Sequence, residues 1–452
     1  MGFISTLNLD KDVFLPYLNT TATLYDLGTG AYIPTVDGHM ALNGGIATTN
    51  GYVGRPQRFK STVALTLVLG AACIYRDLEV IIYDTEFSLT PDRIRALIPN
   101  QAMADDVMAR VVLINPAHDV GKDLETFHAE VVLKLANDKI KRSKDYMVTL
   151  PFIDPKTGKA RTMLRPTIVV TDSWSRAQTG KAWDTMTENL ATDSATNMMA
   201  MYEGNVKTKL MGQMPNLGNR SGIYFVFTAH MGDKFNLNPM SPSIKDQQYM
   251  KQDDKIKGVG SNFGFLTSAL LDLRNSKVLQ DSKKECNYPL QMSHPTEVNQ
   301  VEMMIVRGKN NSAGGMLDLV MSQNSGILNS VTNFHYLKEG KSPAMLGGPI
   351  NYQTLLQPKV NLTRTNIREK AQDYETSRAL EILTQLVFIQ TRWTVNGGPV
   401  DFRMSPDKFA EKLMGNKTPS VDDILNSRGY WTYSEDPRKF MSLYDILEVL
   451  QK

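Results

Sequence analysis

Short apolar runs alternate with segments of helical character from Gly51 onwards. Each run has the length of a strand and is apolar through its centre instead of at every second residue; the runs are Leu78–Asp84, Val111–Pro116, Arg165–Trp174 and Gly222–His230. Runs of this kind predict strands buried on both faces, and helices between them predict a mostly parallel sheet covered on both sides. The expected fold class is therefore α/β, with a mostly parallel, twisted sheet flanked by helices.

Helix signals separate the apolar runs. Ser61–Tyr75 carries few charges and is expected to be a helix, whereas Lys122–Lys144 is amphipathic, with apolar residues on one face. Thr90 is expected to cap a helix that has Pro91 in its first turn.

Three regions follow from the order of these patterns. Residues 1–48 are expected to form an N-terminal segment, residues 49–348 the α/β core, and residues 349–452 a C-terminal, mostly helical region. The helices expected in the last region are Asn366–Gln390, Pro406–Met414 and Met441–Gln451. Within the core, Val301–Asn310 and Gly315–Gln323 are expected to pair antiparallel and close the sheet. Two segments interrupt the rhythm, Ser175–Leu217 and Met231–Phe265, and long segments inside a compact domain are usually functional or disordered.

Composition narrows the class of protein without identifying it. The 452 residues are 42% hydrophobic and 21% charged with a net charge of +3, which is ordinary for a folded protein and does not by itself demand nucleic acid. Two cysteines give no disulfide framework and favour a reducing compartment. The six histidines lack the spacing of zinc ligands. No signal peptide is expected, and no apolar stretch is long enough to predict a transmembrane helix.

The stretch GRPQRFKST keeps the spacing of a phosphate-binding loop, except that Phe59 stands where the pattern G-x-x-x-x-G-K-[ST] has its second glycine. It follows a strand and opens a helix, where backbone N–H groups can hold phosphate oxygens. Lys60 is expected to neutralise the β- and γ-phosphates of ATP, and the Ser61 hydroxyl to ligate Mg²⁺. The expected nucleotide-binding residues here are Gly54, Arg55, Pro56, Gln57, Arg58, Phe59, Lys60, Ser61 and Thr62. Taken alone, the stretch is equally compatible with a plain turn between a strand and a helix.

Two acidic residues stand at the carboxyl ends of predicted strands, the edge where ligands bind in open α/β sheets. Glu86 follows the run Leu78–Asp84, and Asp172 ends the segment TIVVTD, which has the form of a Walker B strand. Glu86 is expected to orient the attacking water, and Asp172 to hold the Mg²⁺ shell through water. An ordinary helix cap is the alternative for either acid.

Taken together, GRPQRFKST, IIYDTEFSLTP and TIVVTDSW resemble the RecA superfamily, and most closely the UvsX-type recombinases of tailed bacteriophages. That family also carries Phe before the lysine of its P-loop, so the resemblance implies that Phe59 is a family variant. It covers Ile33–Leu97 and Thr167–His230, is weaker as far as Gln323, and does not extend to the last hundred residues. It implies a RecA-like core.

The resemblance also implies roles for residues outside these motifs. His230 stands where the family has a polar residue that senses the γ-phosphate, with a capping histidine as the alternative. Arg307 and Lys309 stand where the family has a basic pair that reaches the nucleotide of the neighbouring subunit, with an exposed charge pair as the alternative. The segment from His230 to Phe265 corresponds to the second DNA-binding loop, and its cations and aromatic residues suit single-stranded DNA. Its length and its residues Asp246, Asp253 and Asp254 leave contact of part of it with a neighbouring subunit as the alternative. The DNA-binding residues expected there are Lys255, Lys257, Gly258, Gly260, Phe263 and Phe265; the first DNA-binding loop is expected within Arg176–Met201.

The function implied is that of a DNA-dependent ATPase and strand-exchange protein, with ATP and Mg²⁺ as cofactors. Its implied partners are single-stranded and double-stranded DNA, further copies of itself in a head-to-tail filament, and single-strand-binding and loader proteins, with no membrane. Residues 1–30 are expected to dock on a neighbouring copy. The implied location is the cytoplasm of a bacterial host, at sites of DNA replication. The alternatives are a hexameric helicase motor with a RecA-like fold, and a structural filament protein with weak hydrolysis.

Overall fold

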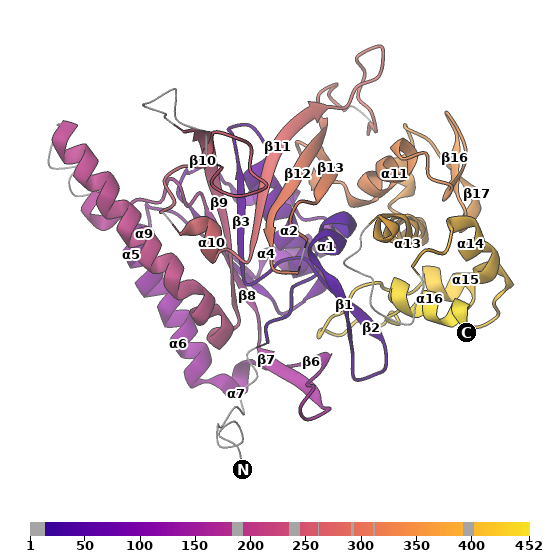
Figure 1. Ribbon diagram of the computed structural model, residues 1–452, viewed down its shortest axis with the longest axis horizontal. Coiled ribbons are helices and arrows are strands. Elements are labelled where there is room, and N and C mark those ends of the chain that lie inside the picture. The colour runs from indigo at the N-terminus through magenta and orange to yellow at the C-terminus, as the bar shows by residue number, and fades with distance from the viewer. Residues whose placement is uncertain are drawn as a thin grey trace.

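A central sheet organises the part of the chain that the computed structural model describes, which is residues 14–182, 193–234, 245–260, 262–290, 293–310, 312–391 and 402–452 (Figure 1). In spatial order its strands are β14 (Gly326–Ile327), β13 (Met316–Ser322), β12 (Val298–Gly308), β11 (Ala269–Val278), β3 (Thr49–Gly54), β9 (Ile223–Asp233), β8 (Thr167–Asp172), β4 (Glu79–Asp84) and β5 (Val111–Ile114), and β10 (Asp254–Ile256) pairs with β9. Neighbours from β11 to β5 pair in parallel, whereas β10 and β12 to β14 pair antiparallel. The predicted α/β class with a mostly parallel sheet is confirmed.

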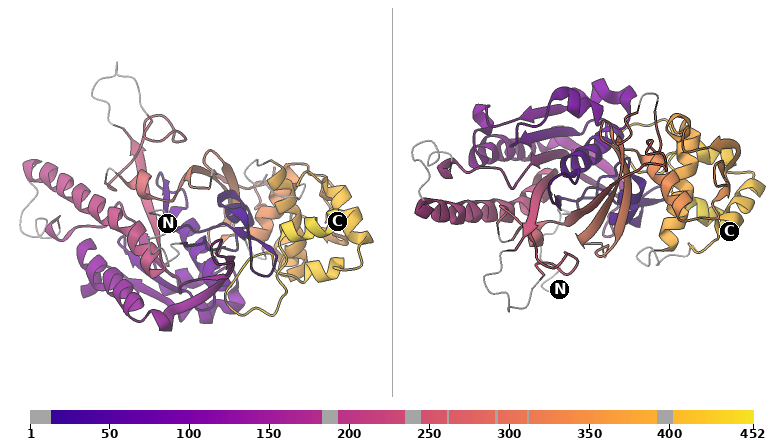
Figure 2. Two further views of the ribbon diagram at one scale, coloured as in Figure 1. Left: turned by 60° about the horizontal axis from the view of Figure 1, so that its bottom comes forward. Right: turned by 90° about the horizontal axis from the view of Figure 1, so that it is seen from above.

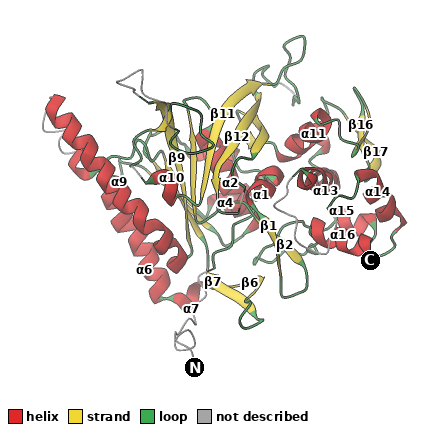
Figure 3. Ribbon diagram, in the orientation of Figure 1, coloured by secondary structure: helices red, strands yellow, loops and turns green. Residues whose placement is uncertain are grey.

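Helices cover both faces of this sheet, as two further views and the colouring by secondary structure show (Figures 2 and 3). Alternate residues of a strand point to opposite faces, and consecutive residues Tyr52 and Val53 of β3 lie in two different apolar clusters. The cluster around Tyr52 includes α2 (Lys60–Ile74), and the cluster around Val53 includes α5 (Leu124–Phe127) and α9 (Asp193–Ser221). Burial from both sides explains why the strands are continuously apolar. The other helices of the core are α3 (Pro91–Ala96), η2 (Gln101–Met103), α4 (Ala104–Met108), η3 (Asp119–Gly121), η4 (His128–Leu133), α6 (Lys134–Lys141) and α7 (Ser143–Tyr146).

Several predicted elements differ in extent from the structure. The helix expected over Lys122–Lys144 is divided into α5, the π-helical turn η4, α6 and α7. Strand β11 was not expected, because only its first half is buried and its second half is polar and largely exposed. The hairpin of β6 (Met147–Ile153) and β7 (Ala160–Leu164) was missed as well. The predicted cap is confirmed, since the Thr90 side chain accepts a hydrogen bond from the backbone N–H of Arg93 at 3.1 Å.

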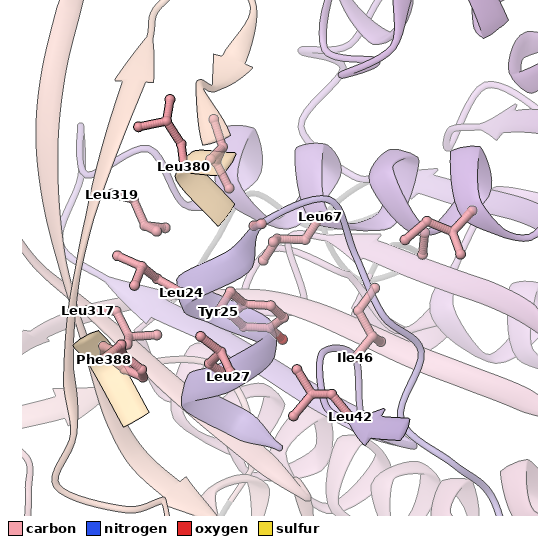
Figure 4. Packing of buried hydrophobic residues seen from close by; sticks show 14 of the residues in the cluster. Leu24, Tyr25, Leu27, Leu42, Ile46, Leu67, Leu317, Leu319, Leu380 and Phe388 are labelled. Carbon is pink, nitrogen blue, oxygen red and sulfur yellow. The ribbon is translucent and has the colours of Figure 1, made fainter. Parts of the chain in front are cut away.

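The N-terminal segment packs into the chain's own core. Helix α1 (Thr23–Thr29) is buried at every residue, and the hairpin β1 (Ala31–Pro34) and β2 (Met40–Asn43) follows it. Figure 4 shows Leu24, Tyr25 and Leu27 of α1 among Leu67, Leu317, Leu319, Leu380 and Phe388. The expectation that residues 1–30 dock on a neighbour is therefore corrected for α1, which is enclosed by its own chain; residues 1–13 lie outside the described residues.

The C-terminal region packs against both the N-terminal segment and the core. Its helices are α12 (Ile367–Lys370), α13 (Tyr374–Gln390), α14 (Pro406–Gly415), α15 (Val421–Leu425) and α16 (Leu443–Gln451), and α11 (Asn329–Glu339) precedes them at the end of the core. The Asp445 carboxylate accepts from the backbone N–H of Met40 at 2.9 Å, and Trp431 packs its ring on Tyr75 and Phe152. A small sheet of β15 (Met345–Gly347), β16 (Tyr352–Thr354) and β17 (Gln357–Leu362) was not expected. The predicted boundary after residue 348 falls between its first two strands.

A membrane-spanning helix is not found among the described residues, where no helix combines sufficient length with sufficient apolar character.

Candidate active site

The loop between β3 and α2 has the strand–loop–helix arrangement of a P-loop. Phe59, at the glycine position of the pattern, caps α2 with φ 59° and ψ 21°, and Gln57 also has a positive φ of 59°. A non-glycine residue in this left-handed region costs about 1–2 kcal/mol. Phe59 therefore supplies the backbone conformation that glycine usually supplies, and its partly buried ring packs against the main core cluster. Gly54 is needed at the start of the loop, because a Cβ there would lie 2.8 Å from the Leu273 carbonyl oxygen.

Lys60 is the first residue of α2, and its side chain turns back under the loop. The ammonium donates to the Arg55 carbonyl at 3.0 Å, and the residue is only 7% exposed. Burial lowers the pKa of Lys60, an effect opposed by the negative charges of Asp172 and Glu86. A buried cation at a helix N-terminus is suited to a polyanionic ligand such as a triphosphate.

Asp172 lies at the carboxyl end of β8, directly opposite the start of α2. Its Oδ1 accepts from the Ser61 hydroxyl at 2.9 Å and from the Thr228 hydroxyl. Its Oδ2 is buried and has no hydrogen-bond partner among the described residues. Burial raises the pKa of this carboxyl group, and the hydrogen bonds from Thr228 and Ser61 oppose the rise.

The Ser61 hydroxyl and the Asp172 carboxylate fit a magnesium ion that also contacts phosphate. Mg²⁺ prefers oxygen ligands and is usually held by one or two protein groups, waters and substrate phosphates. The partnerless Oδ2 of Asp172 is a group that such an ion or its water shell would satisfy. Within the described parts of the chain, no cluster of three or more His, Cys, Asp or Glu side chains that could hold a metal ion is found.

Glu86 follows β4 and is held by two donors. The Ser173 hydroxyl donates to Glu86 Oε1 at 2.8 Å, and His230 Nε2 lies 3.0 Å from the same oxygen. Both bonds end on Oε1, so Oε2 can accept a proton of an attacking water. The hydrogen bond from His230 is the largest cause that lowers the pKa of Glu86, to about 2.

A pH dependence follows from this pKa. A carboxyl group whose pKa is lowered in the folded protein stays ionised until the pH falls through that lowered value. With Glu86 near 2 instead of 4.5, kcat/KM for ATP hydrolysis is expected to show no acid limb from Glu86 as the pH is lowered to about 3. In His230→Ala the largest cause of the lowering is removed. The pKa that the acid limb reports is therefore expected to rise towards the ordinary glutamate value. Profiles of kcat/KM with the same acid limb in both proteins would contradict this assignment.

Arg55, in the same loop, ties the P-loop to the hairpin of β9 and β10. Its guanidinium forms ion pairs with Asp233 at the end of β9 and with Asp254 at the start of β10, the latter at 2.9 Å. The predicted nucleotide loop and the predicted second DNA-binding loop are therefore in direct contact. By contrast, the Arg58 guanidinium donates to the Ser276 hydroxyl on β11 at 3.0 Å.

Arg307 and Lys309 are not brought to this cluster within one chain. Through β11, Arg307 lies in register with Gly51 in β3, three residues before Gly54 where the P-loop begins. The Arg307 guanidinium donates to the Gly264 carbonyl at 2.8 Å, and Lys309 is exposed. Their action on a neighbour's nucleotide stays a prediction.

The residues expected to contact DNA divide into two groups. Lys255 and Lys257 are exposed, and Phe265 is 63% exposed. Phe263 is only 1% exposed, and its ring packs edge-on against Phe227; it lacks the exposure that stacking on a base requires. Gly258 and Gly260 approach neighbouring parts of the protein closely, as described below. Residues 235–244 and 261 of the second loop, and 183–192 of the first, lie outside the described residues.

Several residues of the cluster were missed by the sequence analysis. Ser173 and Thr228 bond directly to Glu86 and Asp172, and Ser175 donates to the loop that carries Lys257. Two signals for them were present in the sequence. Ser173 directly follows Asp172, and Thr228 is a hydroxyl residue inside the apolar run that ends at His230. Their partners come from other strands, so the partners themselves could not be read from the sequence.

Comparison with known proteins does not identify the family of this chain. No protein-family model matches the chain, and no curated protein sequence matches it. Among solved structures, it is similar to the crystal structure of the RadB recombinase, with 13% sequence identity and a TM-score of 0.33, over 63% of this chain and 92% of that one. A similarity with so low a TM-score indicates neither the activity nor the partners of the present chain.

Proposed function

We propose that this protein is an ATP-dependent DNA recombinase that forms filaments on single-stranded DNA and promotes homologous pairing and strand exchange. The observation that carries the proposal is the convergence of Lys60, Ser61, Asp172 and Glu86 at the carboxyl ends of β3, β8 and β4. Hydrolysis of a nucleoside triphosphate needs a cation that binds phosphate, oxygen ligands for magnesium and an ionised carboxylate.

Each side chain has a defined task in this proposal. The N–H groups of the first turn of α2 and the Lys60 ammonium hold the phosphates. Ser61 and Asp172 hold the ion, which when bound neutralises charge on the phosphate oxygens. The ionised Glu86 orients water through Oε2, while His230 fixes its other oxygen. In a filament, Arg307 and Lys309 approach the nucleotide of the adjacent copy.

The DNA-binding part of the proposal rests on the exposed side chains Lys255, Lys257 and Phe265, together with the resemblance described above. Two cations beside an exposed aromatic ring suit a single strand, whose phosphates need neutralising and whose bases can stack. The finer assignments are proposals on the same footing: a UvsX-type recombinase of a bacteriophage, active in recombination, repair and replication in the cytoplasm of a bacterial host. So are its partners, which are double-stranded DNA and single-strand-binding and loader proteins.

The direct test measures ATP hydrolysis with and without single-stranded DNA, and images the protein with ATP and DNA. The proposal expects hydrolysis that DNA stimulates, and helical filaments. Closed rings would favour the helicase motor instead. Filaments without measurable hydrolysis would favour a structural filament protein.

Salt dependence should identify the lysines that contact phosphate. Lys257→Ala is expected to weaken binding of single strands of any sequence and to reduce the slope of log affinity against log salt by about 0.7. Lys134→Ala, at an exposed lysine of α6, is the matched control and should leave the slope unchanged. Fluorescence anisotropy titrations at several salt concentrations measure both, and equal slopes for Lys257→Ala and the unaltered protein would exclude this contact.

A further inference from the structure

The turn Lys257–Gly260, which follows β10, is held through three consecutive backbone carbonyls. The first accepts from the Ser175 hydroxyl at 2.9 Å, the second from the Lys207 ammonium at 2.9 Å, and the third from the Trp174 indole N–H at 3.3 Å. Ser175 and Trp174 come from the segment directly after β8, and Lys207 comes from α9, the long helix at the left of Figure 1. The three donors therefore attach the turn to two other elements at once.

Lys207 is an unusual donor for this position because it is buried. It is 2% exposed, and its ammonium also lies 3.5 Å from the Ser175 carbonyl oxygen. Burial lowers its pKa to about 8, while Glu203 acts in the opposite direction. A lysine is seldom buried unless its ammonium is satisfied, and here backbone carbonyls satisfy it. The side chain cannot reach DNA from this position, so its charge has a role inside the protein.

Glycines allow the turn to approach these elements closely. Gly258 has a φ of 67°, and a Cβ on it would lie 2.8 Å from the Ser175 carbonyl oxygen. A Cβ on Gly260 would lie 2.6 Å from the hydroxyl of Thr208 on α9. Both glycines of the predicted DNA-binding set are thus required for packing of the turn against the protein.

The same turn is bonded to the candidate active site. The backbone N–H of Lys257 donates to the His230 carbonyl at 2.8 Å, and the backbone N–H of His230 donates to the Ser175 hydroxyl at 2.8 Å. The His230 ring in turn contacts Glu86. A short chain of bonds therefore runs from the carboxylate that orients water to the turn that presents the exposed lysines.

We infer that Lys207 is a positioning residue that clamps the Lys257–Gly260 turn onto α9 and the end of β8, so that the exposed Lys255 and Lys257 are held in fixed register with the Glu86–His230 pair. The inference rests on the proposed function, because it assigns these lysines to DNA. The clamp makes DNA contact and ATP hydrolysis depend on each other through one buried ammonium.

Lys207→Met tests the clamp, because methionine keeps the length and apolar stem of the side chain and removes the donor. Lys209→Met is the matched control: it lies two residues away on the same helix and is exposed. Lys207→Met is expected to retain hydrolysis without DNA and its KM for ATP, and to lose about 5-fold or more of the stimulation by single-stranded DNA. Lys209→Met is expected to retain that stimulation.

Two further readouts separate the clamp from a DNA contact and from loss of structure. Lys207→Met should leave the slope of log affinity against log salt unchanged, because the residue releases no counterions from DNA. Amide hydrogen exchange without any ligand should be faster in the Lys257–Gly260 turn than in the unaltered protein, with α2 and β8 unchanged. Gly258→Ala, which disturbs the same contact from the other side, should give the same faster exchange; it serves as the test if Lys207→Met does not fold.

The outcomes distinguish this inference from the proposed function. Unchanged exchange in both variants, or undiminished DNA stimulation in Lys207→Met, overturns the clamp. A reduced salt slope overturns it too, because Lys207 would then be a DNA contact. In a last outcome, both variants show faster exchange but DNA does not stimulate hydrolysis by the unaltered protein. That result supports the clamp as a structural contact and overturns the proposed function.

Discussion

Glu86→Gln is expected to slow ATP hydrolysis by about 10²–10⁴-fold, the range typical of removing a group that handles a proton or a water in the transition state. Glutamine keeps the size of the side chain and can still contact Ser173 and His230. It has no negative charge with which to orient water or accept its proton. ATP affinity should change little, because Glu86 makes none of the expected phosphate contacts.

Single-turnover hydrolysis and calorimetry with ATP measure the two effects separately. Lys60→Ala serves as the contrasting variant and should lose both affinity and hydrolysis, because the buried ammonium acts on the phosphates themselves. The assignment of Glu86 as the residue that orients water is wrong if Glu86→Gln hydrolyses ATP at a rate near that of the unaltered protein. The P-loop assignment fails if Lys60→Ala binds ATP normally.

Leu24→Ala is expected to lower the free energy of unfolding by about 2–5 kcal/mol, as is usual for a buried leucine whose removal leaves a cavity. Leu24 is 1% exposed and lies in one apolar cluster with Leu317 of β13 and Leu380 of α13 (Figure 4). These partners belong to the core and to the C-terminal region. The substitution should therefore destabilise all three regions together.

Urea unfolding followed by circular dichroism and by tryptophan fluorescence measures this effect. Trp174 lies in the core and Trp431 in the C-terminal region, and both are buried, so the two regions share the fluorescence signal. Leu290→Ala, at an exposed leucine, should change the free energy of unfolding by less than about 0.5 kcal/mol. A Leu24→Ala protein whose circular dichroism and fluorescence transitions no longer coincide would show that α1 does not join the regions.

Two strand ends beside the candidate site were predictable. Asp84 and Asp172 end β4 and β8 as the sequence indicated, because a strand buried on both faces stops where polar side chains begin. Strand β11 was not predicted, since its second half is polar. Phe263 was also expected to contact DNA, but its ring is buried and packs against Phe227. Local sequence cannot show which aromatic ring is buried, since its neighbours come from distant parts of the chain.

The sequence by itself determined the α/β class, the four continuously apolar strands β4, β5, β8 and β9, and the spacing of Lys60, Ser61, Glu86 and Asp172 along the chain. These follow from local apolar periodicity and from the rule that parallel strands end at one edge. Only the tertiary structure decided that Phe59 adopts a left-handed backbone, that α1 is enclosed by α2, β13 and α13, and that Lys207 reaches the turn at Gly258. Each of these depends on contacts between residues far apart in the chain, where packing and hydrogen bonding outweigh local preference.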